Sequence, residues 1–189
     1  SLIILFRFDC QKIKMKGKLR FGVFGGGSWG TALVKMLSEN LDKVGWYMRN
    51  ESAIRHIKEE GHNPNYISAV EFDVAKLSLS HDFNNSIENS DVLIFAIPSA
   101  FLENELQNLT VSLKDKIIFS AIKGIVPESG KIVGEHFHDN YGIPFENIGV
   151  ITGPCHAEEV ALERLSYLTI ACADGDKAKW VAKALESDY

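Results

Sequence analysis

Short apolar runs alternate with stretches in which apolar residues recur every three or four positions, so strands and helices are expected in turn. The predicted strands cover residues of about 19–24, 44–48, 77–80, 92–97, 116–121, 148–152 and 167–172. The predicted helices cover residues of about 28–39, 51–60, 83–89, 99–108, 128–139, 155–162 and 176–186. This alternation predicts an α/β fold with a parallel sheet and right-handed crossovers.

The first predicted strand ends in three consecutive glycines. Gly25, Gly27 and Gly30 have the G-x-G-x-x-G spacing, and a predicted helix follows them. In such a turn the first glycine permits the sharp bend, the second lets a pyrophosphate approach the backbone, and the third lets the helix pack closely on the strand. The N–H groups at the helix start would face the phosphates. The motif therefore predicts a dinucleotide site, and the alternative is a glycine-rich turn in some other kind of α/β protein.

Arg49 follows the second predicted strand and lies 19 residues past Gly30. An acidic residue near that position would bind the ribose 2′-hydroxyl of NAD, whereas an arginine can meet the 2′-phosphate of NADP. It can also stack on the adenine ring. Glu51 is close enough in sequence to act as a substitute acid. The preference between NAD and NADP therefore stays open, as does a plain surface role for Arg49.

Other candidate residues follow the later strands, because ligands of such sheets bind outside the carboxyl ends of the strands. Lys123 could project into the cleft and bind a substrate phosphate or polarise a carbonyl, and its alternative is a surface lysine. Gly153 begins a second turn, in which we interpret Cys155 as a small side chain rather than a nucleophile. His136 and His138 are two residues apart on one predicted helix and face different ways. We expect both to be solvated rather than to bind a metal.

Composition narrows the picture only slightly. The chain has 189 residues, 46% of them hydrophobic, and a formal charge of −5, which gives no reason to expect a nucleic-acid partner. Its three cysteines are widely spaced, so neither a disulfide framework nor a metal site is expected, and a reducing compartment fits. The apolar run at 2–6 is too short to cross a membrane. We expect residues 1–14 to be upstream or cloning-derived sequence, or else a short strand, and residues 15–189 to form one domain.

Together these segments resemble the bacterial-type NAD(P)-dependent glycerol-3-phosphate dehydrogenases. The resemblance covers about residues 16 to 189, and its segments occur in the order of that family. They are GGGSWGTA at 25–32, Val44, Trp46 and Arg49 as V-x-W-x-x-R, a degenerate N-x-x-Y-L-P at 63–67, VLIFAIPS at 92–99, AIKGI at 121–125 and GPCHAEEVA at 153–161.

The resemblance implies a Rossmann-type, doubly wound and mostly parallel sheet. It implies reversible hydride transfer between NAD(P)H and dihydroxyacetone phosphate, giving sn-glycerol 3-phosphate for phospholipid synthesis in a cytoplasmic enzyme that is commonly a homodimer. By position it assigns cofactor contacts to Gly25, Gly27, Ser28, Trp29, Gly30, Arg49, Lys123 and Ala157, and substrate contacts to Lys123, Gly153 and Cys155.

This chain departs from the family in two ways. Cys155 replaces the usual serine or threonine, and a thiol is a poorer hydrogen-bond donor than a hydroxyl. The family also continues into an all-helical domain that supplies the lysine acting as general acid/base. We expect that lysine to lie beyond Tyr189, the last residue of the sequence, and therefore expect no catalytic acid or base within these 189 residues. Weak cofactor binding and little turnover follow from this expectation.

Three alternatives remain. The first is another dehydrogenase of this architecture, such as a 6-phosphogluconate or ketopantoate enzyme, although AIKGI followed by GPCHAEEVA argues against it. The second is a non-catalytic module that senses dinucleotides. The third is a structural domain without a ligand.

Overall fold

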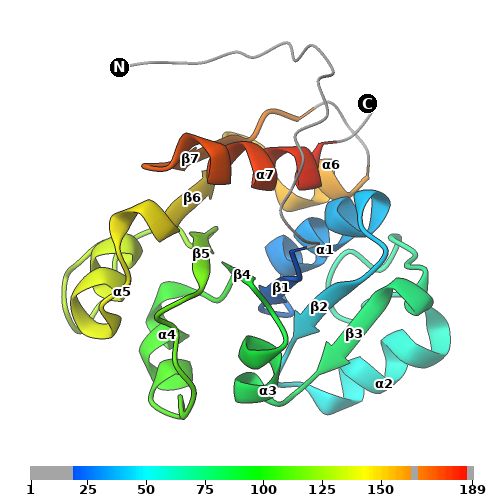
Figure 1. Cartoon of the computed structure of the whole chain (residues 1–189). Helices are drawn as coiled ribbons and strands as arrows, with labels where there is room; N and C mark the ends of the chain where they lie inside the picture. Colours follow the sequence, from blue (N-terminus) through cyan, green and yellow to red (C-terminus); the bar gives the residue numbers. More distant parts are fainter. Residues whose placement is uncertain (1–18, 163–165, 187–189) are drawn as a thin grey trace.

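A central sheet organises the molecule (Figure 1). The computed structural model describes residues 19–162 and 166–186. In this part of the chain the sheet has seven strands in the order β3-β2-β1-β4-β5-β6-β7. Their bounds are β1 Phe21–Phe24, β2 Val44–Tyr47, β3 Leu77–Ser80, β4 Val92–Phe95, β5 Ile117–Ser120, β6 Ile148–Thr152 and β7 Thr169–Cys172. The strand order reverses direction between β1 and β4, which confirms the expected doubly wound, Rossmann-type fold.

Two predictions concern the ends of the chain and lie outside the described residues. One is the origin or strand structure of residues 1–14, and the other is the position of the family's general acid/base lysine beyond Tyr189. Tyr189 itself is not among the residues that the structure describes, so both statements stay predictions.

β7 departs from the parallel arrangement. The strands from β3 to β6 pair in parallel, but β7 runs antiparallel to β6, with Thr152 opposite Thr169. After β6 the chain turns back, and β7 runs beside β6 in the opposite direction. An antiparallel neighbour of this kind needs no crossover helix. The short helix α6 (Ala157–Ala161) in this connection packs against the first helix instead. The sheet is therefore mostly parallel, not wholly so.

Helices cover both faces of the sheet. One core cluster joins the sheet to α1 (Ser28–Asn40), α2 (Glu51–Glu60), α6 and α7 (Gly175–Leu185). The other joins it to α3 (Phe83–Glu88), α4 (Ser99–Leu106) and α5 (Val133–Tyr141). Neighbouring strand residues alternate between the clusters, with Leu93 and Phe95 in one and Val92 and Ile94 in the other. Figure 1 shows α1, α6 and α7 on one side of the sheet and α4 and α5 on the other.

The helix boundaries follow local capping chemistry. Asn50 accepts a hydrogen bond from Ala53 N and caps α2, which covers the predicted residues 51–60. Helix α5 begins five residues later than predicted. Ile125 and Ile132 form an antiparallel bridge around Gly130, whose φ of +67° suits glycine, so the chain turns back before the helix starts. Among the described residues, no helix is both long and apolar enough to cross a membrane.

One prediction about polar side chains is wrong. His136 is 1% exposed, because α5 turns that face toward the core, although His138 on the same helix stays partly accessible. His136 Nδ1 lies 3.1 Å from Asn140 Nδ2 and 3.7 Å from the Glu103 carboxylate. Its Nε2 has no hydrogen-bond partner among the described residues. This burial lowers the pKa of His136 below its ordinary value.

Candidate functional site

The glycine turn after β1 is built by close backbone contacts. Gly25 has a φ of +135°, and its N–H donates to Tyr47 O at 3.0 Å. A Cβ added to Gly30 would lie 2.0 Å from Gly25 O, so only glycine lets α1 begin this close to the strand. Gly27 differs, because no described atom other than those of Gly27 and its two chain neighbours lies within 4 Å of the position that its Cβ would take. The backbone at Gly27 therefore borders open space that a ligand could fill.

Three side chains hold the carbonyl oxygens of this turn. Trp46 Nε1 donates to Gly25 O at 2.9 Å. Asn63 Nδ2 donates to Gly26 O at 3.1 Å and to Thr31 Oγ1 at 2.9 Å, and Thr31 Oγ1 donates to Gly27 O at 2.9 Å. All three side chains are buried. The sequence alone assigns them no such role, because their partners are backbone atoms of the turn; the N-x-x-Y segment that begins at Asn63 is the available signal.

The start of α1 suits a phosphate. Its N-cap is Gly27, and no described side chain caps the first turn, which also contains no acidic residue. The first N–H groups of a helix carry a partial positive charge and lack partners within the helix. The turn and the helix start thus fit a diphosphate by donor chemistry and by space.

A cleft of about 580 Å³ opens beside this turn, between the ends of β1, β2 and β4. Arg49 lies at its wall, with Nε 3.1 Å from Glu105 Oε1 and Cζ 5.6 Å from the centre of the Phe101 ring. The Tyr47 hydroxyl donates to Glu105 Oε2 at 2.6 Å. Burial, and then the hydrogen bond to Glu105, raise the pKa of Tyr47, so it remains a donor at neutral pH.

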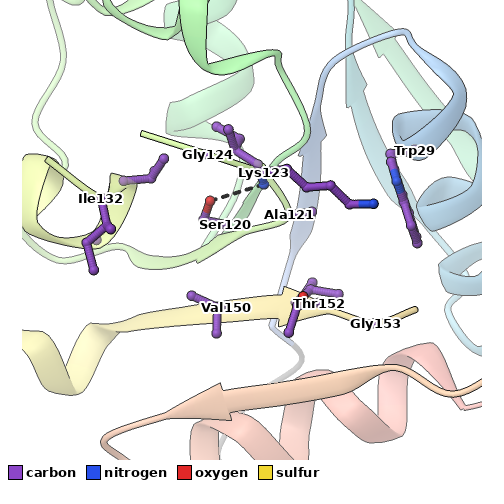
Figure 2. A pocket seen from close by; sticks show the side chains of 13 residues that line it. Trp29, Ser120, Ala121, Lys123, Gly124, Ile132, Val150, Thr152 and Gly153 are labelled. Atoms are coloured by element: carbon purple, nitrogen blue, oxygen red, sulfur yellow. Dashed lines mark hydrogen bonds between the residues drawn. The ribbon is translucent and has the colours of Figure 1, made fainter. Parts of the chain in front are cut away.

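A second cleft, of about 420 Å³, lies beyond α1 between the ends of β5 and β6. Lys123 Nζ lies 5.8 Å from the centre of the Trp29 ring, within cation–π range. Figure 2 shows the Lys123 side chain extending toward Trp29, with Thr152 and Gly153 along the β6 side. The structure thus brings Trp29, Lys123 and Gly153 together. Gly25, Gly27 and Arg49 belong to the other cleft. Ser28 is the first residue of α1, between Gly27 and Trp29 in sequence, and lines neither cleft.

Two predicted contact residues lie deeper. The Cys155 thiol is buried and donates to Tyr167 O at 3.5 Å. Ala157 is also buried and belongs to the core cluster that includes α1. Their predicted contacts with substrate and cofactor stay predictions. Across the described ranges, 19–162 and 166–186, no three His, Cys, Asp or Glu side chains are grouped to hold a metal ion.

Comparison with known proteins gives a consistent picture. The model for the "NAD-dependent glycerol-3-phosphate dehydrogenase N-terminus" matches residues 20–178. The chain is 31% identical to the glycerol-3-phosphate dehydrogenase [NAD(P)+] of Latilactobacillus sakei, over 88% of this chain and 50% of the relative. It is 32% identical to that of Ectopseudomonas mendocina, over 86% of this chain and 47% of the relative. The chain thus spans about half the length of the curated relatives it matches.

Comparison with solved structures leads to the same kind of protein. The structure of Plasmodium falciparum glycerol-3-phosphate dehydrogenase matches with a TM-score of 0.81 and 22% identity, over 92% of this chain and 51% of that one. At this identity the match shows a shared fold.

Proposed function

The chain belongs to the family of NAD-dependent glycerol-3-phosphate dehydrogenase N-terminal domains, and on this premise we propose that it forms the cofactor-binding half of an oxidoreductase. The reaction is the reversible reduction of dihydroxyacetone phosphate to sn-glycerol 3-phosphate, a precursor of phospholipids. Residues 15–189 act as the dinucleotide-binding domain of a cytoplasmic homodimer. When bound, NAD(P)H supplies the hydride.

One observation carries this proposal: the glycine turn and Lys123 lie on the same rim of the sheet, on either side of Trp29. Gly25 and Gly30 allow the close backbone packing of the turn, Gly27 leaves the backbone open for a diphosphate, and the N–H groups from Ser28 onward bind it. Arg49 binds the adenosine end.

The Lys123 cleft receives the nicotinamide end and the substrate. The Lys123 ammonium, held over Trp29, attracts the substrate phosphate or polarises its carbonyl, and Trp29 limits access of water. Gly153 keeps the wall thin, because a Cβ there would lie 2.5 Å from Tyr167 O. Cys155 and Ala157 are buried behind this wall, and their assignment to the substrate and the cofactor rests on the resemblance of GPCHAEEVA at 153–161 to the family.

Calorimetric titration of the 189-residue chain with NADH and with NADPH tests the binding half of the proposal. We expect saturable binding of at least one of them, and little oxidation of NADH when dihydroxyacetone phosphate is added. Absence of binding of either dinucleotide up to millimolar concentration would favour a purely structural domain.

The catalytic half is tested on the product of the complete gene, by following NADH absorbance with a panel of keto substrates. Oxidation that depends on dihydroxyacetone phosphate supports the proposal. Dinucleotide binding without any hydride transfer would instead identify a sensing module, and activity on another keto acid would identify a different dehydrogenase. A rate in the 189-residue chain equal to that of the complete product would contradict the division of roles.

A further inference from the structure

The carboxylate that faces the adenosine end of the first cleft comes from an unexpected element. Glu105, on α4, is 7% exposed and lines the same cleft as Arg49 and the glycine turn. Its Oε1 lies 3.1 Å from Arg49 Nε, and its Oε2 accepts the Tyr47 hydroxyl at 2.6 Å. Both oxygens keep a further lone pair, because a carboxylate oxygen can accept two hydrogen bonds.

Glu51, the acid that sequence position suggests, is directed elsewhere. Its side chain is 66% exposed and lies 3.7 Å from His81 Nε2, near the start of α3. The residues that line the cleft near Arg49 include Asn50 and Glu105 but not Glu51 within the described chain. The acidic partner of the site therefore comes from the helix after β4 rather than from the helix after β2.

The arrangement changes what Arg49 can offer. A free guanidinium at the end of β2 would favour a 2′-phosphate, since arginine binds phosphate in a bidentate way. Here Nε is bound to a buried carboxylate, and the guanidinium lies over the Phe101 ring. The pair has no net charge, and a phosphate dianion at Arg49 would also approach the buried carboxylate of Glu105, which repels it. A 2′-hydroxyl meets no such repulsion and can donate to the carboxylate.

We propose that Glu105 selects the dinucleotide that lacks a 2′-phosphate, so that the cleft binds NADH in preference to NADPH. Glu105 acts as a positioning residue for Arg49 and as the acceptor for the ribose hydroxyl. This inference rests on the proposed function, because it specifies which cofactor the same site accepts.

The test is the ratio of dissociation constants for NADPH and NADH, measured by calorimetry on the 189-residue chain. We expect the wild-type chain to bind NADH about tenfold more tightly than NADPH, and this ratio is measured without any variant. Glu105→Gln keeps the size of the side chain and a hydrogen bond to Tyr47 but removes the charge, so the ratio should fall about tenfold, mainly through tighter NADPH binding. Glu105→Asp keeps the charge and should retain the preference for NADH.

Glu51→Gln is the matched control. It also removes one negative charge beside β2, but outside the cleft, so the ratio should change less than about twofold. A wild-type preference for NADPH, or a ratio that Glu105→Gln and Glu51→Gln change equally, would overturn the inference and leave the proposed function intact. Failure of the wild-type chain to bind either dinucleotide would overturn the proposed function and this inference with it.

Discussion

The glycine turn and the Lys123 cleft, which lie at the same rim of the sheet, are built in different ways. At the glycine turn, the carbonyl oxygens of Gly25, Gly26 and Gly27 each accept a hydrogen bond from a buried side chain. At the Lys123 end the lysine is exposed, and its contact with Trp29 is a cation–π contact rather than a hydrogen bond. Large apolar side chains there also remain accessible to solvent, namely Ile125, Ile132 and Val150.

This difference concerns preorganisation. A turn whose polar groups are satisfied by the protein keeps its shape without a ligand, so binding there costs little reordering. A lysine held by a cation–π contact at an exposed site gains only about 0.5–1 kcal/mol from it and remains free to adapt. We therefore expect changes to the buried contacts of the glycine turn to affect folding and binding together, and changes at Lys123 to affect binding alone.

The largest expected effect comes from Gly30→Val. The added Cβ would meet Gly25 O at 2.0 Å, and neither this carbonyl nor the helix backbone that carries the Cβ can move without breaking the turn. We expect the free energy of unfolding to fall by roughly 3–5 kcal/mol. Denaturant unfolding followed by circular dichroism measures it.

Gly27→Ala is the control, because its Cβ would enter open space, with no described atom beyond its chain neighbours within 4 Å. We expect its stability to change by less than about 0.5 kcal/mol, while dinucleotide affinity falls about tenfold. Equal stability of the two variants would contradict the close packing of α1 on β1.

Trp46→Phe should have the next largest effect. The indole N–H is the donor to Gly25 O, and the side chain is 1% exposed, so the variant leaves a buried carbonyl without its partner. We expect a loss of about 2 kcal/mol in stability, together with weaker dinucleotide binding. Trp180→Phe, on α7, controls for the loss of an indole. An equal effect of both variants on dinucleotide affinity would argue against a special role for the hydrogen bond to Gly25.

The sequence alone predicts the glycine turn better than the distant residues that surround the two clefts. The G-x-G-x-x-G spacing and the apolar run before it are local patterns, and they locate the turn and the start of α1 correctly. The partners Asn63 and Glu105 are not predictable in this way, because each reaches its target across a long stretch of chain. Burial of His136 also depends on how α5 sits against α4, which spacing along one helix does not reveal.

Lys123→Met sharpens the comparison from the other end. The variant removes the charge but keeps a long apolar side chain over Trp29, so the fold should be unaffected. We expect stability to change by less than about 0.5 kcal/mol and NADH affinity to fall by about threefold to tenfold. Calorimetry measures the affinity. Lys114→Met removes an exposed charge before the amino end of β5, opposite the carboxyl ends of the strands, and should leave affinity unchanged. A large loss of stability in Lys123→Met alone would show that this end is as tightly built as the glycine turn.

The smallest effect concerns pH and again separates the two ends. Helix α5 supplies Val133 and Gly134 to the Lys123 cleft and also carries His136. Burial lowers the pKa of His136 below its ordinary value of 6.5. Among the nearby charges, Glu103 and Glu128 act to raise this pKa and Lys131 acts to lower it. At pH values between the pKa of His136 in the folded chain and 6.5, the unfolded chain binds more protons than the folded chain. The contribution of the neutral, buried His136 to stability is therefore fully present above pH 6.5. As the pH drops through that window, the free energy of unfolding falls by at most about 1.4 kcal/mol per pH unit. Hydrogen exchange at pH 7.5 and 5.5, corrected for intrinsic rates, should therefore show protection lost at α5 more than at α1. In His136→Leu this difference should disappear, whereas in His81→Gln, which alters an exposed histidine beside α2, it should persist. The same pH response in wild type and in His136→Leu would mean that a group other than this histidine loosens the Lys123 end.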